Sequence, residues 1–318
     1  MRRDIVDASL AIQAEGLTKR YGSALAVDGL NLEIPAGQFF GLLGPNGSGK
    51  TSTIHMLSTL IRPSHGTARV AGHDVNRASL QVRAAIGVVF QESALDRTLS
   101  VAENLRFAGL LHSLSVAQIK ERSSELLDLF GLGEKRNRPV AALSGGQRRA
   151  LDIARGVIHR PQILFLDEPT IGLDVPNRRN IWRFIERLRV EQNITVLLTT
   201  HYLEEAADCD QVVFINHGRL VKNGAPHELI DALGSHIIEI EAADARELAR
   251  DLEPRLGPCY LDGDKAYFRH TGRDVAPLVQ LQTDLAERAT SVRWRKPNLN
   301  DVFLWVNEAG AGGGKYSL

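Results

Sequence analysis

Two patterns of hydrophobic and polar positions follow one another in the N-terminal part of the chain. Short runs that alternate apolar and polar residues occupy residues 12–34, with turn signals at Gly22, Gly29 and Pro35. An alternating pattern broken by such residues is typical of antiparallel strands and turns. We therefore expect an antiparallel β subdomain before Gln38, where the pattern changes.

From Gln38 onward, strand-length apolar runs are separated by stretches with helical spacing. Strands are predicted at residues 39–43, 86–90, 163–166 and 196–200, and helices at residues 52–61, 101–130 and about 177–190. Strands that alternate with helices indicate a parallel sheet, and the long helical stretch between the second and third strands is an insert. Pro63 is expected to end the first helix. These elements predict an α/β fold.

The pattern after about Leu229 predicts a second, smaller domain. Short β-like stretches occur there at residues 236–241, 265–270 and 291–295. They alternate with helix-like stretches at residues 245–252, 274–288 and 300–306. Because these stretches are short and mixed, we expect a small α+β domain, separate from the parallel sheet.

The predicted elements give four segments. Residues 1–10 form an N-terminal lead, and residues 11–228 form the α/β domain with a helical subdomain at about residues 92–158. Residues 229–308 form the C-terminal accessory domain. The glycine-rich residues 309–318 are expected to be a flexible tail.

Charge and cysteine content limit the classes of function. The 38 lysines and arginines balance 38 aspartates and glutamates, so no field of the whole chain attracts nucleic acid, and no nucleic-acid partner is expected. Basic clusters at residues 148–149, 178–179 and 293–296 are predicted to be solvated surface. Cys209 and Cys259 lack metal-ligand spacing, which indicates core packing in a reducing cytoplasm.

The apolar runs are too short to cross a membrane. A spanning helix needs about 20 apolar residues, and the strongest runs here have the length of strands. The first residues also lack the apolar region of a signal peptide. If the chain works on membrane cargo, another polypeptide must supply the path.

A glycine-rich segment joins the first predicted strand of the parallel sheet to the following helix. Backbone N–H groups of such a loop turn towards phosphates, the helix N-terminus favours negative charge, a lysine reaches the β and γ phosphates, and a hydroxyl binds magnesium. The segment therefore predicts an ATP site, with these residues at the ligand: Gly44, Pro45, Asn46, Gly47, Ser48, Gly49, Lys50, Thr51 and Ser52.

Polar residues follow three other predicted strands. Asp167 ends one strand, at the sheet edge where open α/β sheets bind ligands, and is expected to orient magnesium near Thr51. Glu168 comes next and is placed to activate a water as general base. Gln91 and His201 follow two further strands, so both are expected to reach the γ-phosphate.

A second short motif identifies a family. Leu143, Ser144, Gly145, Gly146 and Gln147 precede a helix, where Ser144 and the two glycines form another anion-binding N-terminus. Together with the phosphate loop, this segment resembles the signature motif of ATP-binding subunits of ABC transporters. The resemblance covers residues 11–224 and implies a P-loop ATPase core.

The resemblance also implies roles for individual residues. Gln91 is then the Q-loop glutamine, Asp174 lies in the D-loop of residues 172–174, His201 is the switch histidine, and Tyr21 stacks on adenine. The magnesium ligands become Thr51, Gln91 and Asp167. In the family the signature motif closes over the nucleotide of a partner subunit, so a second copy of the chain is the expected partner in a head-to-tail dimer.

A narrower resemblance concerns the type of transporter. Residues 95–105, 151–155 and 298–304 are similar to the ATPase subunits of daunorubicin/doxorubicin-resistance exporters. This similarity implies ATP-driven export of a small amphipathic drug through separate transmembrane permease subunits, with the chain on the cytoplasmic face of the cell membrane as a peripheral protein. From its own pattern, the last of these segments is an amphipathic helix start that packs Leu299, Val302 and Phe303.

Three alternatives are weighed against export. A soluble ATPase of translation or DNA repair is disfavoured, because there is one set of motifs and the interval between Lys50 and Asp167 is short. A regulatory protein that binds ATP without turnover is disfavoured because every catalytic position is filled. The ATPase subunit of an importer stays open.

Overall fold

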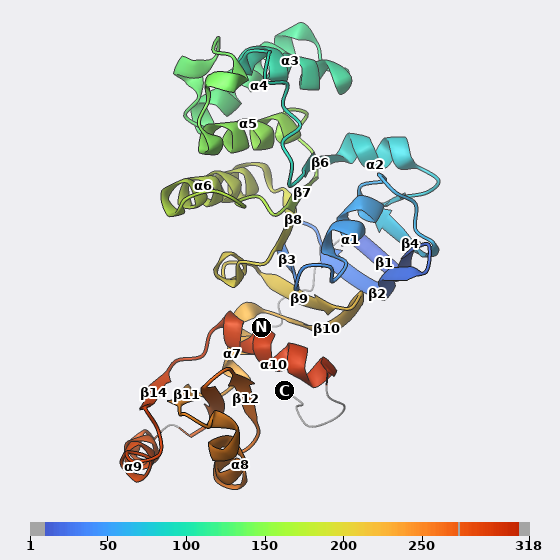
Figure 1. Cartoon of the computed structure of the whole chain (residues 1–318). Coiled ribbons are helices and arrows are strands. Elements are labelled where there is room, and N and C mark those ends of the chain that lie inside the picture. The colour runs from blue at the N-terminus through green and yellow to red at the C-terminus, as the bar shows by residue number, and fades with distance from the viewer. Residues whose placement is uncertain (1–9, 273, 312–318) are drawn as a thin grey trace, which may run out of the picture. The chain divides into compact units, whose positions relative to one another are not determined.

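The computed structural model of the chain describes residues 10–272 and 274–311 (Figure 1). The chain forms two compact units, one of Met1–His201 with His217–Leu220 and the other of Tyr202–Asn216 with Val221–Leu318. The division between these units does not coincide with the domain boundary expected between residues 228 and 229. Nearly all of the expected lead and most of the expected tail lie outside the described residues.

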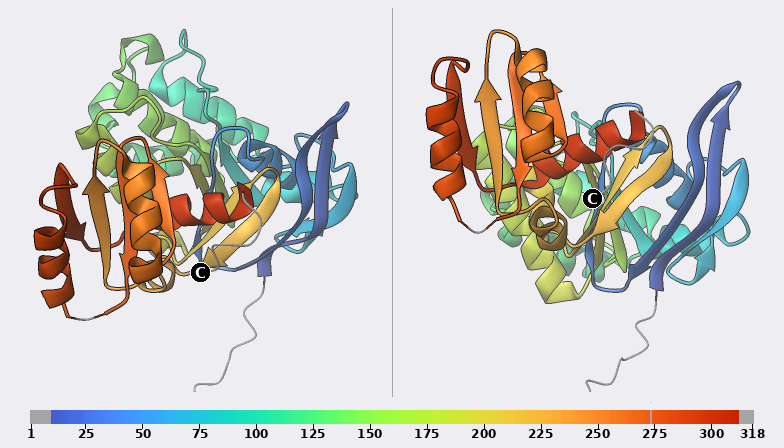
Figure 2. Two further views of the ribbon diagram at one scale, coloured as in Figure 1. Left: turned by 60° about the horizontal axis from the view of Figure 1, so that its bottom comes forward. Right: turned by 90° about the horizontal axis from the view of Figure 1, so that it is seen from below.

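The N-terminal strands form the expected antiparallel sheet. Its order is β2-β1-β4-β5, with β1 (Leu10–Tyr21), β2 (Ala24–Pro35), β4 (His65–Val70) and β5 (His73–Asp74). Gly22 lies in the turn between the two long strands, which run side by side in Figure 2. Gly29 does not break β2, contrary to the prediction. It adopts φ 63° within the strand, and the register with β1 shifts around it, so the glycine accommodates a bulge.

Four buried parallel strands lie in the first unit in the order β3-β8-β7-β6. They are β3 (Phe39–Leu43), β8 (Thr195–Thr200), β7 (Ile163–Asp167) and β6 (Ile86–Val89). Their continuous apolar sequences suit strands covered on both faces. Leu43 pairs with Thr200, and Asp167 pairs with Thr199. The segments that follow β3, β7 and β8 therefore begin at one edge of the sheet.

The helices of the first unit connect these strands. They are α1 (Lys50–Leu57), α2 (Ser79–Ala85), α3 (Val101–Leu111), α4 (Val116–Leu129), α5 (Gly145–Val157) and α6 (Val175–Gln192), with short 3₁₀ turns at Gly133–Lys135 and Val140–Ala142. The helices expected within residues 101–130 are α3 and α4, and each begins with a capping box, at Ser100 and at Ser115. Helix α1 ends before Pro63, at Leu57, and Thr59 then adopts a positive φ of 64°.

The second unit contains a four-stranded antiparallel sheet with order β12-β13-β11-β14. Its elements are η3 (Leu203–Ala206), β9 (Gln211–Asn216), α7 (Pro226–Asp231), β11 (His236–Glu241), α8 (Ala245–Leu256), β12 (Cys259–Asp262), β13 (Lys265–His270), α9 (Ala276–Asp284), β14 (Ser291–Arg295) and α10 (Leu299–Ala311). Strand β10 (Arg219–Gly224) is divided between the units. The sequence pattern missed β12.

One face of this sheet packs on α8 and α9 (Figure 2). The shared core includes Ile238, Phe268, Leu248 and Leu281, all at most 3% exposed. Helix α10 buries Leu299 and Val302 as expected, and it continues through the first residues of the expected tail to Ala311. No helix within residues 10–272 and 274–311 is long and apolar enough to span a membrane.

Candidate nucleotide site

The phosphate loop occupies the turn from β3 to α1. Gly47 and Gly49 adopt φ values of 78° and 108°, which only glycine reaches without strain. A Cβ atom on Gly49 would also lie 2.4 Å from the carbonyl oxygen of Ala26. Gly49 is the N-cap of α1, and no side chain caps that helix end. The first turn of α1 therefore keeps its N–H groups available for an anionic ligand.

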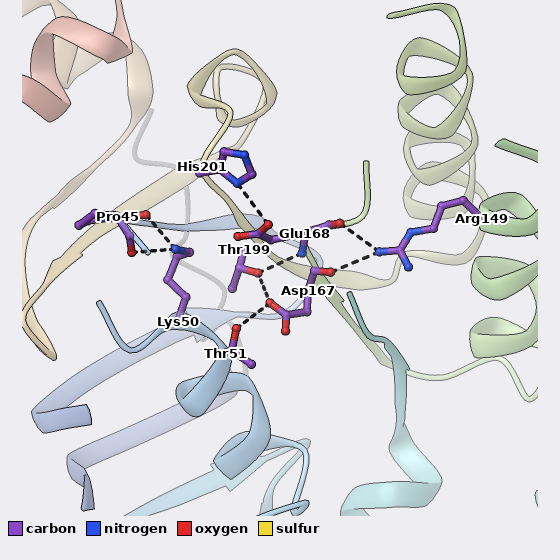
Figure 3. Close-up of polar contacts among 9 residues, drawn as sticks. Pro45, Lys50, Thr51, Arg149, Asp167, Glu168, Thr199 and His201 are labelled. Atoms are coloured by element: carbon purple, nitrogen blue, oxygen red, sulfur yellow. Dashed lines mark hydrogen bonds and ion pairs between the residues drawn. The ribbon is translucent and has the colours of Figure 1, made fainter. Parts of the chain in front are cut away.

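Lys50 is folded over this loop (Figure 3). The residue is 5% exposed, and Nζ donates hydrogen bonds to the carbonyl oxygens of Gly44 at 2.8 Å and Pro45 at 3.1 Å. Burial lowers the pKa of Lys50, while the carboxylates of Glu168 and Asp167 oppose that shift. The loop thus holds an ammonium group where the phosphates of a nucleotide would bind.

Asp167 meets the start of α1 from the end of β7. The residue is 2% exposed, and its Oδ1 accepts hydrogen bonds from Thr199 Oγ1 at 2.5 Å and Thr51 Oγ1 at 3.3 Å. Two hydroxyl donors thus satisfy one oxygen of the buried carboxylate and hold it in place. The threonine of the phosphate loop and the aspartate at the end of β7 are therefore in direct contact.

Glu168 and His201 form a pair at the same edge of the sheet (Figure 3). His201 Nδ1 lies 3.2 Å from Glu168 Oε2, and the side chain of Glu168 is 12% exposed. The Glu168 N–H donates to the carbonyl oxygen of Thr199 at 3.1 Å and to its Oγ1 at 3.2 Å. Glu168 has a positive φ of 47°. The carboxylate is consequently held beside the loop by a constrained backbone.

A cavity of about 570 Å³ connects these groups. This volume is in the range of small-ligand sites. It is lined by residues of the phosphate loop, by polar residues that follow the other strands, and by two apolar residues. These are Ala26, Asn46, Gly47, Gly49, Lys50, Thr51, Ser52, Gln91, Glu168, Ile171 and His201. The structure therefore brings six of the nine expected loop residues, both expected catalytic residues and Gln91 around one space, whereas Gly44, Pro45, Ser48 and Asp167 do not line it.

Tyr21 lies close to the loop at the end of β1 but does not line the cavity. It is 49% exposed, and its hydroxyl is 3.5 Å from Ser52 Oγ. Lys19 Nζ lies 5.2 Å from the centroid of the ring, at the distance of a cation–π contact. The ring can therefore offer a face to a planar group above the loop.

The signature segment forms the start of another helix. Ser144 is the N-cap of α5, where its Oγ accepts from the Gln147 N–H at 3.2 Å and its own N–H donates to Gln147 Oε1 at 3.0 Å. A Cβ atom on Gly146 would lie 2.3 Å from Asn177 Oδ1, so glycine is required there by packing against α6. The residues of the signature segment do not line the cavity described above.

The D-loop residue caps the helix beside the signature segment. Asp174 is the N-cap of α6, and its Oδ1 accepts from the Asn177 N–H at 2.9 Å. The same Asn177 packs against Gly146. The signature segment and the D-loop are therefore neighbours in this chain, while Asp174 stays exposed.

Arg149 and Arg295, both expected at the solvated surface, instead make specific contacts within the fold. Arg149 is 8% exposed, and its guanidinium donates to the carbonyl oxygens of Asp167 and Glu168 (Figure 3). Arg295 makes a bidentate ion pair with Asp301, which is 1% exposed. Sequence reasoning also missed Thr199, although its place at the end of a strand next to His201 was a usable signal. Nothing in the sequence distinguished Arg149 from Arg148.

Known proteins share this arrangement over most of the chain. Residues 27–171 match the family model described as ABC transporter. The chain is 47% identical over 304 residues to the daunorubicin/doxorubicin resistance ATP-binding protein DrrA of Streptomyces peucetius, covering 92% of this chain and 91% of that protein. It is 40% identical over 301 residues to the Nod factor export ATP-binding protein I of Ralstonia nicotianae, with 92% of each chain covered.

Solved structures agree with these relatives. The chain resembles cbiO1 from Clostridium perfringens, described as part of an ABC transporter complex, with a TM-score of 0.65, 27% identity, and coverage of 78% of this chain and 96% of that one. It also resembles a dimeric ATP-binding cassette bound to ADP and Pi, with a TM-score of 0.62, 26% identity, and coverage of 67% and 98%. The predicted P-loop ATPase fold is confirmed. This chain belongs to the ATP-binding, ATP-hydrolysing subunits of ABC transporters.

Proposed function

We propose that this subunit powers export of a small amphipathic drug through separate transmembrane permease subunits. The observation that carries the ATPase part is the pairing of Glu168 with His201 beside Lys50 in one cavity. Export rather than import is supported by the names of two relatives, one a drug-resistance protein and the other a Nod factor export protein. In this proposal the chain works as a peripheral protein on the cytoplasmic face of the cell membrane.

The polar groups of the cavity, together with Tyr21 beside it, have roles in binding and hydrolysis. The N–H groups of the phosphate loop and Lys50 bind the β and γ phosphates, and Tyr21 stacks on adenine. Glu168 accepts the proton of the attacking water, and the adjacent His201 orients the carboxylate and contacts the γ-phosphate. The constrained backbone of Glu168 supports this role, because a positioned base must keep its orientation while substrate binds.

The residues at the cavity also fit magnesium. Thr51 and Asp167 present oxygen atoms 3.3 Å apart, and Gln91 lines the same space. No group of three or more histidine, cysteine or carboxylate side chains in the described parts of the chain is suited to hold a metal. Mg²⁺ usually keeps waters and binds substrate phosphates with only one or two protein ligands. When bound, the ion would neutralise charge on the β and γ phosphates.

The signature segment needs a phosphate from another molecule. Ser144 starts a helix whose N-terminus suits an anion, yet the segment does not line the cavity at Lys50. We propose that two copies bind head to tail, so that Ser144 of one copy faces the nucleotide on Lys50 of the other. The dimeric cassette among the similar structures supports this arrangement.

Transport in membrane vesicles tests the export proposal. Inside-out vesicles from cells that express this chain and its membrane subunit should accumulate daunorubicin when ATP is added, because export from the cell is uptake into such vesicles. The matched control is Glu168→Gln, which keeps the shape of the site and removes the base. ATP hydrolysis without any ATP-dependent movement of drug would contradict the cargo. Loss of preloaded drug from the vesicles would indicate an importer.

A further inference from the structure

Arg149 connects the signature helix to the residues that surround the cavity. It lies on α5, five positions after Ser144, which corresponds to about 7.5 Å along the helix axis. Its Nε donates to the carbonyl oxygen of Pro169 at 2.5 Å, and Nη1 donates to that of Phe90 at 2.6 Å. Nη2 donates to the carbonyl oxygens of Asp167 and Glu168, both at 3.2 Å. One guanidinium therefore binds four backbone acceptors, and Figure 3 shows those at Asp167 and Glu168.

These acceptors belong to two segments that reach the cavity. Asp167 ends β7, and Glu168, the proposed general base, and Pro169 follow it directly. Phe90 directly precedes Gln91, which lines the cavity. A planar fork with five N–H donors can bind several acceptors in fixed directions, whereas the ammonium of lysine is a point donor on a flexible stem. The geometry thus requires arginine at this position.

Glu168 is held from both sides of its own backbone. Thr199 accepts from its N–H, and Arg149 donates to its carbonyl oxygen. Between these two contacts the residue keeps a positive φ of 47°, a conformation that a non-glycine residue rarely adopts without support. A shift of α5 would move one of the two supports, and the direction of the Glu168 carboxylate would change with it.

We propose that Arg149 is a positioning residue that transmits the position of the signature helix to Glu168 and Gln91 of the same chain. This inference rests on the proposed sharing of ATP sites between two copies. When the signature segment of one chain binds the nucleotide of its partner, α5 of that chain is fixed, and Arg149 fixes the general base in that chain's own site. The two ATP sites of the dimer are coupled through this side chain.

The test compares Arg149→Met and Arg149→Lys with a matched control, Arg122→Met, in the full-length protein together with its membrane subunit. Arg122 also donates to a carbonyl oxygen, that of Ile158 at 3.2 Å, but away from the cavity. We expect Arg149→Met to lower kcat by roughly 10-fold to 100-fold, because small misplacement of a catalytic group has effects of that size. The Kd for ATP should change less than about 3-fold, since none of the four carbonyls belongs to the phosphate loop.

The other variants separate positioning from general damage to the fold. Arg149→Lys should lower the melting temperature and the activity less than Arg149→Met does, since lysine restores some of the hydrogen bonds. Arg122→Met should retain the wild-type kcat. If Arg149→Met does not fold, Arg149→Lys tests whether Arg149 positions Glu168. A wild-type kcat for Arg149→Lys would overturn the proposal.

A double variant tests whether Arg149 acts through Glu168. In a chain that already carries Glu168→Gln, Arg149→Met should produce little further loss of kcat, because the group it positions is gone. A further loss of the same factor as in the wild-type background would overturn the proposal. The coupling itself is read from the Hill coefficient for ATP, which should fall towards 1 in Arg149→Met.

The failure of the dimer proposal gives a different result. A wild-type chain that hydrolyses ATP as a monomer with a Hill coefficient of 1 has no shared sites, and coupling between sites is then excluded. The loss of kcat caused by Arg149→Met can still be compared between the wild-type chain and the Glu168→Gln chain. That comparison reports whether Arg149 positions Glu168. Equal kcat for wild type and Arg149→Met would overturn that part, whatever the oligomeric state.

Discussion

Helix α1 begins after Gly49 and helix α5 after Ser144, and the N-terminus of each suits an anion. The two helices differ in which groups accept hydrogen bonds from the N–H groups of their first turn. The N-cap of α1 is Gly49, with φ 108° and no side-chain cap. The N-cap of α5 is Ser144, which forms a reciprocal capping box with Gln147. The first helix therefore depends on a ligand to satisfy its N-terminal donors, whereas the second is already stable without one.

Their surroundings differ even more. Lys50, Glu168 and His201 line the cavity at α1, so this end offers binding groups and a base together. The start of α5 has Asn177 and the D-loop as neighbours, and Arg149 lies further along the helix. In the proposed dimer, the N-terminus of α1 lies among the residues for hydrolysis, and the N-terminus of α5 contributes phosphate donors and connects through Arg149 to Glu168.

Removing the base should have the largest effect at the α1 end. Glu168→Gln should slow ATP hydrolysis by about 10²-fold to 10⁴-fold, the usual contribution of positioned acid–base catalysis. The Kd for ATP should stay the same, because the glutamine side chain has nearly the same shape. Phosphate release and equilibrium nucleotide binding measure the two effects separately. Wild-type turnover with unchanged binding would remove Glu168 from the mechanism.

The glycines at the two helix starts give a matched pair. Gly49→Ala places a Cβ atom 2.4 Å from Ala26 O at a strained φ, so the free energy of unfolding should fall by roughly 2 to 4 kcal/mol. Gly145→Ala meets nothing nearer than 3.9 Å, and the free energy of unfolding should change by less than about 0.5 kcal/mol. Denaturant unfolding of both variants measures this difference. Equal losses would show that the two loops are under the same constraint.

The far end of α5 should respond to pH. His159 follows this helix, stacks on His112 with centroids 3.6 Å apart, and contacts Ile86 O through Nε2. Burial, reinforced by His112, lowers the pKa of His159 to about 4. The unfolded chain takes up this proton near pH 6.5 while the folded chain stays neutral, so stability is full above about pH 6.5 and is lost as the pH falls towards 4.

From these pKa values, the free energy of unfolding should fall by about 2 kcal/mol between pH 7 and pH 5 on account of His159. His159→Gln keeps a donor for Ile86 O but does not titrate. The fall in its free energy of unfolding between pH 7 and pH 5 should therefore be smaller than that of wild type by about 2 kcal/mol. His73→Gln, at an exposed histidine, is the control. Equal pH slopes for wild type and His159→Gln would contradict the assignment.

The contact with adenine should have the smallest effect. Tyr21→Ala should weaken ATP binding by roughly 1 kcal/mol or more, the order of one aromatic contact, while Tyr21→Phe should bind nearly as well as wild type. The comparison isolates the ring from the hydroxyl, which is 3.5 Å from Ser52 Oγ. Binding is measured by titration calorimetry in the Glu168→Gln background. Unchanged affinity for Tyr21→Ala would place the adenine elsewhere.

Elements set by local pattern could be predicted from the sequence. The buried strand at residues 39–43 and those at 236–241 and 265–270 have the predicted bounds, because short apolar or alternating runs already define them. The loop residues could be assigned because glycine, lysine and threonine spacing encodes phosphate binding directly. Gly29 was predicted to break a strand, since a bulge depends on the register of the neighbouring strand rather than on the local sequence.

Arg149 was predicted to be solvated but is buried, and the local sequence could not have shown this. Arg148 and Arg149 are adjacent and chemically identical, and only Arg149 faces the carbonyl oxygens at residues 90 and 167–169. These acceptors come from distant parts of the chain and meet only after the parallel sheet forms. Strand β12 was missed for a related reason, because its pairing with β13 supports a segment that includes the polar Asp262.

The central claim is that each ATP site combines Lys50 of one chain with Ser144 of the other. Lys50→Ala removes a phosphate contact, and Ser144→Arg fills the signature site, so each variant alone should be inactive. When the two purified variants exchange subunits, in the presence of the membrane partner if dimerisation requires it, about half of the dimers are mixed by random pairing. One site of a mixed dimer then carries both substitutions, and the other carries neither.

Phosphate release from the mixture, with subunit exchange verified by pull-down of a tagged chain, is the most direct measurement. The account predicts that activity returns on mixing, because one intact loop then faces one intact signature segment. Full ATPase activity in a chain that remains monomeric throughout the assay would contradict it.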